Sequence, residues 1–242
     1  MNSKIKLGVN IDHVATVRNA RGTIYPSPLR AAILAQESQV DSVTLHIRED
    51  RRHIREHDLV QIKNRIKIPI NLEMAPTLSM LSIALKHKPD YVCIVPEKRQ
   101  ELTTEGGLNV VKYYKKIKFI VNKLNNNKIR TSLFINPTIK DVTYSKRINT
   151  NCIEIHTGKI SDLIKNNKNY KKELIKIKNC SRYANSLGLE VHAGHGMDYK
   201  TSKVLTKIYE IKEFNIGHFI IGESISIGLK NVIKRIKKII NK

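Results

Sequence analysis

Residues 131–157 read TSLFINPTIKDVTYSKRINTNCIEIHT and contain the pattern that decides the fold. An apolar run, TSLFINP (131–137), is followed by an amphipathic stretch, TIKDVTYSKRI (138–148), and then by a second apolar run, CIEIHT (152–157). Continuous apolar runs of this length are typical of strands buried on both faces of a parallel sheet. Because neighbouring parallel strands need a crossover, usually a helix, the stretch predicts a strand–helix–strand unit.

The same alternation continues along the rest of the chain and predicts eight strands, each followed by a helix. Two helix boundaries carry recognisable signals, Pro28 near the start of one and Gly188 at the end of another. The other predicted strands are KLGVNI (6–11), SVTLHI (42–47), IPINLEM (68–74), YVCIVP (91–96), LEVHAG (189–194) and HFIIG (218–222). The other predicted helices cover residues 28–39, 54–66, 77–88, 108–124, 170–188, 199–211 and 225–240.

A strict alternation of eight strands and eight helices indicates a closed barrel of the α/β class. An open doubly wound sheet would carry a Gly-rich phosphate loop after its first strand, whereas NIDHVATVRNARG (10–22) matches no such motif. We therefore predict a single (β/α)8 TIM-barrel domain over residues 1–242. Three long connections, 12–27, 97–107 and 157–169, follow strands and predict extra helical segments in the βα loops, on the face where barrel enzymes build their sites.

The net charge of the 242-residue chain is +23, from 44 Lys and Arg against 21 Asp and Glu. Such an excess is typical of nucleic-acid-binding proteins, but here the Lys residues are spread over the predicted helices. Eight of the Arg residues lie within the first 65 positions, where few Lys occur, which indicates that Arg is kept where geometry matters. We therefore expect no nucleic-acid partner, and a basic nucleic-acid-binding protein is retained only as a minor alternative.

The compartment is predicted from what the sequence lacks. No apolar run reaches the roughly 18–20 residues of a membrane helix, and the N-terminal MNSKIKLGVNI has no signal-peptide core. The cysteines, Cys93, Cys152 and Cys180, are odd in number and form no C-x-x-C pair, so buried core positions are favoured over disulfides or zinc. These features predict a cytoplasmic protein with no membrane partner.

Ionisable and amide side chains occur at or just past the carboxyl ends of the predicted strands. In a closed barrel these ends converge on one mouth, although they are far apart in sequence. Any one of these residues has an ordinary alternative as a surface or core polar group, but their recurrence at most strand ends favours a site. The group comprises Asn10, Asp12, His13, His46, Arg48, His53, Glu73, Glu97, Asn136, Glu154, His156, His192 and His195.

The glycines of VHAGHG (191–196) and NIGHFIIG (215–222) favour small phosphorylated substrates. They lie around predicted strands seven and eight, where barrels commonly bind phosphate on backbone N–H groups. The Arg-rich HIREDRRHIR (46–55) offers guanidinium forks for phosphate, although with its own acidic residues it fits a solvated helix start equally well.

Acid–base chemistry is the activity that these strand ends favour. His46, Glu73 and His195 would supply proton-transfer groups from separate strands. A divalent metal is the competing use of His and Glu, but neither an H-x-H pair at the first strand nor H-E-x-x-H occurs. We therefore expect no metal.

Seven motifs carry a resemblance to a known family: GVNIDHVATVRNARGT, VTLHIREDRRHI, INLEMA, VPEKRQELTTEGGLNV, IEIHTG, AGHG and NIGHFIIG. In their order and spacing, from about residue 7 to the C-terminal helix, the chain closely resembles the pyridoxine 5′-phosphate synthase family. The resemblance implies a (β/α)8 transferase of vitamin B6 biosynthesis. It would condense 3-amino-2-oxopropyl phosphate with 1-deoxy-D-xylulose 5-phosphate into pyridoxine 5′-phosphate, phosphate and water. The resemblance also implies a homo-octamer without a metal or organic cofactor.

The same resemblance implies roles for individual residues. His46 and Glu73 match proton acceptors, His195 matches a proton donor, and Glu154 matches a transition-state stabiliser. Asn10, Arg21, Gly196, Gly217 and His218 match contacts to the amino-oxopropyl phosphate, whereas Asp12, His13, Arg48, His53 and Thr103 match contacts to the deoxyxylulose phosphate. One departure is His192, which stands where the AGHG motif is expected to follow Asn and could alter the pKa of His195. The alternative function is another phosphate-handling barrel enzyme, such as an isomerase or a metal-dependent aldolase.

Overall fold

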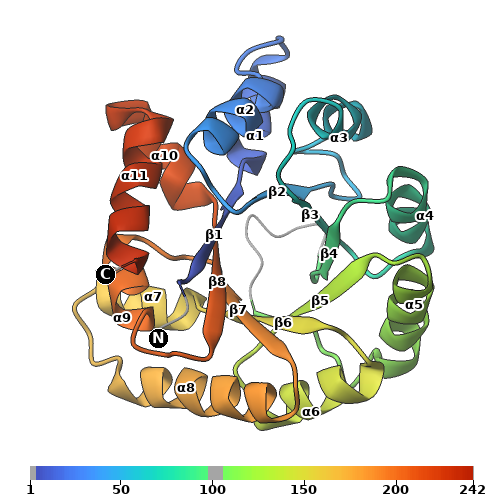
Figure 1. Cartoon of the computed structure of the whole chain (residues 1–242), viewed down its shortest axis with the longest axis vertical. Helices are drawn as coiled ribbons and strands as arrows, with labels where there is room; N and C mark the ends of the chain where they lie inside the picture. The colour runs from blue at the N-terminus through green and yellow to red at the C-terminus, as the bar shows by residue number, and fades with distance from the viewer. Residues whose placement is uncertain (1–3, 98–105, 242) are drawn as a thin grey trace.

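The computed structural model describes residues 4–97 and 106–241, and its centre is a closed barrel of eight parallel strands (Figure 1). Each strand pairs with the next in sequence, and β8 pairs with β1 to close the barrel. The strands are β1 (Lys6–Asn10), β2 (Ser42–His46), β3 (Ile70–Met74), β4 (Tyr91–Ile94), β5 (Arg130–Ile135), β6 (Cys152–His156), β7 (Glu190–Gly194) and β8 (Ile211–Ile216). The predicted (β/α)8 TIM-barrel fold is confirmed.

Helices surround the barrel in a ring, as Figure 1 shows. The helices that return the chain to the next strand are α2 (Pro28–Glu37), α3 (Glu56–Lys63), α4 (Leu78–His87), α5 (Tyr114–Asn126), α6 (Ile139–Ile148), α8 (Lys171–Ser186), α9 (Tyr199–Leu205) and α11 (Leu229–Ile240). Three further helices lie in βα connections: α1 (Asp12–Arg21), α7 (Gly158–Lys165) and α10 (His218–Ile227). The extra helical segments predicted within 12–27 and 157–169 are therefore present.

The predicted position of the eighth strand, 218–222, is wrong. HFIIG forms the first half of α10, and β8 is the preceding IKEFNI at Ile211–Ile216. The apolar-run criterion failed because Glu213 and Asn215 interrupt the apolar pattern of β8 and are nonetheless buried, at 4% and 5% exposure. The helix predicted over 199–211 ends at Leu205, because Ile211 already belongs to β8. The helix predicted over 225–240 is divided at Gly228, whose φ is +81° and which separates α10 from α11.

Strand residues alternate between an apolar layer and a polar barrel interior. Leu7, Val9, Val43 and Leu45 are fully buried in the cluster that joins the strands to the surrounding helices, and burial of each such side chain contributes about 1.5–3 kcal/mol. The intervening positions carry polar groups, which are also buried: Thr44, Asn71, Ser132, Glu154, His192 and Glu213. The polar interior brings hydrogen-bonding groups up to the carboxyl ends of the strands.

The described residues also test the predictions about membrane helices and about the cysteines. Within residues 4–97 and 106–241, no helix is long and apolar enough to cross a membrane. Cys93, Cys152 and Cys180 are buried and unbridged, as predicted for core residues.

Candidate active site

A cavity of about 560 Å³ opens at the carboxyl ends of the barrel strands. All the residues to which the family resemblance gives a role, and which the structure describes, line this cavity except Arg21. Four members of the strand-end group do not line it: Glu97, Asn136, His156 and His192. The predicted residues in its wall are Asn10, Asp12, His13, His46, Arg48, His53, Glu73, Glu154, His195, Gly196, Gly217 and His218. The barrel therefore gathers into one place side chains that are more than 200 positions apart in sequence.

Arg21 and Thr103 are the two predicted residues that are not assigned to this wall. Arg21 is exposed at the last position of α1 and does not line the cavity, so its contact with a phosphate stays a prediction. Thr103 lies outside the residues that the structure describes.

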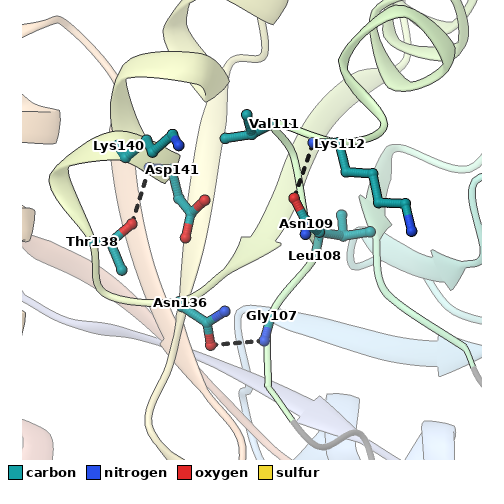
Figure 2. Close-up of a pocket in the computed structure, with 9 residues that line it drawn as sticks. All are labelled: Gly107, Leu108, Asn109, Val111, Lys112, Asn136, Thr138, Lys140 and Asp141. Carbon is teal, nitrogen blue, oxygen red and sulfur yellow. Dashed lines mark hydrogen bonds between the residues drawn. The ribbon is translucent and has the colours of Figure 1, made fainter.

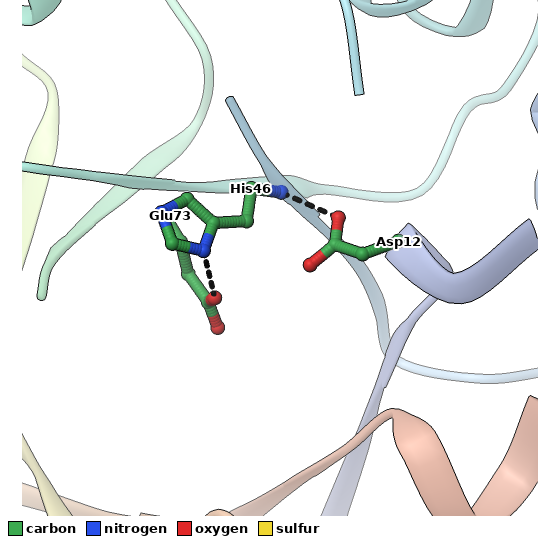
Figure 3. Close-up of side chains that lie close together, drawn as sticks. All are labelled: Asp12, His46 and Glu73. Carbon is green, nitrogen blue, oxygen red and sulfur yellow. Dashed lines mark hydrogen bonds and ion pairs between the residues drawn. The ribbon is translucent and has the colours of Figure 1, made fainter. Parts of the chain in front are cut away.

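Asp12, His46 and Glu73 form a compact group on one wall (Figure 3). An oxygen of Asp12 at the start of α1 accepts the backbone N–H of His46 at 2.7 Å, and its other oxygen accepts Asn10 Nδ2, also at 2.7 Å. The Nδ1 atom of His46 lies 3.6 Å from Glu73 Oε2, because these two residues are partners in the β2–β3 register. The group can offer three ligand atoms within 4.8 Å of one another, so it is able to hold a metal ion.

The buried carboxyl groups of the cavity have raised pKa values. Burial raises the pKa of Asp12 to about 6, against the charges of His46 and Arg48 and hydrogen bonds that lower it. Burial also raises the pKa of Glu154 to about 7. The pKa of Glu73 is raised well above its ordinary value by burial and then by the nearby charges of Asp12 and Glu154. Asp12 and Glu154 are therefore able to hold or release a proton near neutral pH, as general acid–base groups must.

His195, on the opposite wall, is held in a strained and crowded position. Its φ is +77°, in the left-handed region, and the hydroxyl of Thr157 donates to the carbonyl oxygens of both Gly194 and His195 at 2.7 Å. Its ring stacks on that of His156, with centroids 4.8 Å apart. A side chain at position 158 would meet both rings, since a Cβ built on Gly158 lies 2.7 Å from His156 and 3.0 Å from His195. Burial lowers the pKa of His195, so the neutral ring is favoured.

Three more imidazoles and an arginine line the cavity near α1. The ring of His13 lies 5.0 Å from that of His218 and 5.9 Å from that of His53. Burial lowers the pKa of His13 and of His53 to about 4, aided by neighbouring positive groups. The Arg48 side chain is buried and lies 3.4 Å from an Asp50 oxygen. Cationic and N–H groups of this kind, gathered in one buried region, favour an anionic ligand.

A helix N-terminus adds a second set of donors. Helix α10 begins just after Gly217. The backbone of Gly217 packs closely against Asn10, since a Cβ built on Gly217 would lie 2.9 Å from Asn10 Cβ. Gly217 provides no side-chain cap for α10, so backbone N–H groups at the start of the helix stay available to a ligand. Gly196, with φ +73°, lines the cavity from the β7–α9 loop.

Some cavity residues were not selected from the sequence. Asp162 and Lys165 project from α7, inside the long connection 157–169 that the sequence had singled out. Asn215 donates to Glu154 Oε2 at 2.8 Å, but it lies in a strand whose position was predicted wrongly. Phe134 packs edge-on against His156, and an apolar residue in a strand gives no signal of its own.

His192, the departure from the expected motif, does not line the cavity. Its Nε2 lies 2.8 Å from Glu190 Oε1 and its Nδ1 lies 3.9 Å from Glu213 Oε1, inside the barrel. In the β6–β7 register it is paired with Glu154, and its charge lowers the pKa of that carboxyl against the larger effect of burial. The lowered pKa of His195 comes instead from burial, with further lowering by Lys165 and His218 and against the opposing charge of Asp162. His192 therefore acts on Glu154 rather than on His195.

A second cavity, of about 590 Å³, lies between the segments that follow β4 and β5 (Figure 2). Gly107 N–H donates to Asn136 Oδ1 at 2.9 Å, and Asp141 N–H donates to the Thr138 hydroxyl at 3.0 Å, which caps α6. None of the residues predicted for catalysis lies in its wall. We assign the chemistry to the first cavity.

A parallel eight-stranded barrel whose mouth combines acid–base residues with anion-binding groups defines a phosphate-handling barrel enzyme. Residues 7–242 match the family described as "Pyridoxal phosphate biosynthesis protein PdxJ". The chain belongs to this family.

Two curated relatives are similar to this chain over almost its whole length. The chain is 57% identical to the pyridoxine 5′-phosphate synthase of Pelagibacter ubique (strain HTCC1062), covering 98% of this chain and 99% of the relative. It is 50% identical to the enzyme of that name from Zymomonas mobilis, covering 98% and 92%. The predicted function, a pyridoxine 5′-phosphate synthase of vitamin B6 biosynthesis that acts on phosphorylated substrates, is thus confirmed.

Among solved structures, the chain is similar to thiamine phosphate pyrophosphorylase from Pyrococcus furiosus, with a TM-score of 0.64, 11% identity and coverage of 99% and 96%. It is also similar to 3-keto-L-gulonate-6-phosphate decarboxylase from Vibrio cholerae, with a TM-score of 0.64, 12% identity and coverage of 98% of both chains. At these identities the likeness shows the shared barrel fold alone.

Proposed function

We propose that the cavity condenses 3-amino-2-oxopropyl phosphate with 1-deoxy-D-xylulose 5-phosphate, with the whole chain acting as one catalytic domain. One observation carries this proposal: acid–base groups and anion-binding groups line the same 560 Å³ cavity from several sides. Two phosphorylated substrates need two anion-binding regions. The His13–His53–Arg48 region and the start of α10 supply them.

The phosphate contacts follow this division. The deoxyxylulose phosphate is contacted by Asp12, His13, Arg48, His53 and Thr103, and the guanidinium of Arg48 supplies the positive charge. The amino-oxopropyl phosphate is contacted by Asn10, Arg21, Gly196, Gly217 and His218. What supports the division is that Gly217 and His218 lie at the uncapped start of α10, whereas Arg48 and His53 lie on the connection that follows β2.

Proton transfer is the main work of this reaction. The amine attacks the sugar ketone, and loss of water gives a Schiff base; enolisation, release of one phosphate and ring closure with a further loss of water then complete the pyridine ring. Glu73 and His46 take protons from carbon and nitrogen, and His195 gives a proton in a later step. Glu154, in the wall of the cavity, stabilises the positive charge that develops on the nitrogen. Glu154, whose pKa burial raises to about 7, is able to change its protonation state near neutral pH.

The direct test is to mix both substrates with purified protein and follow the pyridine chromophore and the released phosphate. We expect both signals to appear together, and substitution of Glu73→Gln or His195→Ala to remove most turnover while circular dichroism and thermal unfolding stay close to wild type. Near-normal turnover in either variant would refute its assignment.

The group of Asp12, His46 and Glu73 supports one other candidate, a metal-dependent aldolase, because its three ligand atoms lie within 4.8 Å of one another. Exhaustive chelation separates the two. A synthase without a cofactor keeps its full rate after chelation, whereas an aldolase of this kind loses its activity and regains it when a divalent metal is added.

The assembly and compartment belong to the same proposal. We infer a homo-octamer on the strength of the family resemblance. A cytoplasmic location and the absence of a nucleic-acid partner rest instead on the cysteine usage and on the spread of the basic residues. Light scattering coupled to size-exclusion chromatography measures the assembly directly, and a mass well below eight chains would overturn it.

A further inference from the structure

Glu97 follows β4 and reaches across the mouth of the barrel to His46. Its Oε1 lies 2.8 Å from His46 Nε2, and both side chains are almost completely buried, at 5% and 7% exposure. None of the roles that the family resemblance implies includes Glu97. It also does not line the cavity, so it is placed to act through His46 rather than on a substrate.

The carboxylate of Glu97 is fixed at both oxygens. Its Oε2 accepts the backbone N–H of Glu49 at 3.0 Å, from the connection that follows β2. Burial alone would raise the pKa of Glu97, but the hydrogen bond and charge of His46, together with the Glu49 N–H and Arg48, outweigh burial and lower it. Glu97 is therefore ionised at neutral pH and can only accept hydrogen bonds.

An ionised acceptor at Nε2 decides which nitrogen of His46 carries the proton. The Nε2 atom must be the donor, so a neutral His46 ring keeps its lone pair on Nδ1. That atom faces Glu73, at 3.6 Å from Oε2, which is longer than a hydrogen bond. The ring thus offers an unprotonated nitrogen on the side of Glu73, which lines the cavity.

We propose that Glu97 is a positioning residue that holds His46 as the Nε2–H tautomer, with Nδ1 as the base. The proposal deepens the proposed function, because it rests on His46 as a proton acceptor. A carboxylate that orients an imidazole in this way is a recurrent arrangement in general-base catalysis.

Several other charged groups surround His46 and contribute to any pH profile. Glu73 faces it from β3, and Asp12 from α1 accepts its backbone N–H at 2.7 Å. Arg48 and His53 lie on the connection after β2, and the charge of His46 influences the pKa of His53. The test must therefore separate Glu97 from these groups.

The test is Glu97→Gln, compared with Glu49→Gln as a matched control. A Gln at 97 keeps the size of Glu but can donate as well as accept, so it no longer dictates the tautomer. We expect kcat to fall by about 10²–10⁴-fold, with KM changed less than about threefold. Glu49 is the neighbouring glutamate, but its side chain is exposed and only its backbone contacts Glu97, so Glu49→Gln should keep the wild-type rate.

Two further measurements distinguish positioning from a merely structural role. In ¹⁵N NMR of the folded wild type, His46 should show Nε2 protonated and Nδ1 bare, and Glu97→Gln should give a mixture of tautomers. In a His46→Ala background, Glu97→Gln should cause no further loss of rate. A wild-type kcat and tautomer in Glu97→Gln, or a full additional loss in the double variant, would overturn the proposal.

The two hypotheses fail in different ways. If wild-type protein releases no phosphate from the two substrates, the proposed function fails, but the NMR measurement still tests Glu97 on its own. If turnover is present and the tautomer does not depend on residue 97, only the role of Glu97 fails.

Discussion

Replacement of Glu154 by Gln should change the pH dependence of the free energy of unfolding. Compared with wild type at the same pH, the variant should gain stability as the pH rises. Glu154 is 3% exposed, and its immediate partners are Asn215 Nδ2 at 2.8 Å and Cys93 Sγ at 3.9 Å from the same oxygen. His192, its partner in the β6–β7 register, is engaged by Glu190. Burial consequently raises the pKa of Glu154 to about 7, so the ionised form is costly in the native state.

The sign and size of the effect follow from proton linkage. Between pH 4.5 and 7 the native state holds a proton that the unfolded state has released, so wild-type stability falls as the pH rises through this interval. The gap between the ordinary pKa of 4.5 and the native value of about 7 corresponds to about 3 kcal/mol. Gln has nearly the same shape and never ionises, so the variant does not pay this cost.

The assay is urea unfolding of wild type and Glu154→Gln at several pH values from 4.5 to 8. Other buried acids, such as Asp12 and Glu73, titrate in both proteins, so the quantity to compare is the difference between the two at each pH. We expect this difference to move in favour of Glu154→Gln by about 3 kcal/mol over the range. Glu37→Gln, at an exposed ion pair with Lys230, is the control and should give a flat difference. A flat or falling difference for Glu154→Gln would refute the reasoning.

Three further predictions concern space, charge and protonation. Gly194→Ala should lose at least about tenfold in turnover and about 1–3 kcal/mol in stability, because its Cβ would lie 2.1 Å from Glu154 Oε1. Gly222→Ala in α10, where a Cβ meets nothing within 4 Å, should keep its rate and gain about 0.5–1 kcal/mol; equal losses in both would contradict the steric account. Asp58→Asn should cost about 3–5 kcal/mol in urea unfolding, since it leaves the buried guanidinium of Arg18 without its carboxylate; a loss below about 1 kcal/mol would count against this. In ¹H NMR, the rings of His13 and His53 should not titrate between pH 5.5 and 8, because their pKa values are about 4, and a titration near 6.5 would show that they are not desolvated.

Most of the barrel was predictable because its strands are apolar on the face that packs against the helices. SVTLHI and CIEIHT became β2 and β6 nearly as predicted, since one or two polar residues within a strand do not hide the apolar run. In β8 the inward-facing Glu213 and Asn215 reduce the apolar face to Ile211, Phe214 and Ile216. The neighbouring HFIIG is more apolar than β8 itself, so a rule based on apolar runs selects the wrong segment.

The site was predictable where a residue lies at the end of a correctly placed strand. Glu73 and His195 are of this kind, since strand order alone brings them to the mouth. Asp162 and Lys165 could not be placed from sequence, because the path of the connection 157–169, and hence the direction of α7, depends on its packing against the rest of the barrel. Glu97 was seen at a strand end, but its bond to His46 depends on a side-chain geometry that spacing does not encode.

The order of the carboxyl and imidazole pKa values in the mouth is reversed relative to water, because burial disfavours the charged form of both kinds of group. In solution a carboxyl group ionises near pH 4 and an imidazole near 6.5. Here burial raises the pKa of Asp12 to about 6 and that of Glu154 to about 7, whereas it lowers those of His13 and His53 to about 4.

Burial therefore moves the pKa values of these carboxyl groups toward neutral pH, and it keeps the rings of His13 and His53 neutral there. Glu97 departs from this pattern, since its two hydrogen bonds keep it ionised in spite of burial. In our proposal, this anchored carboxylate gives one imidazole, His46, a defined tautomer. The Glu97–His46 pair then determines that a proton is taken up at Nδ1 of His46.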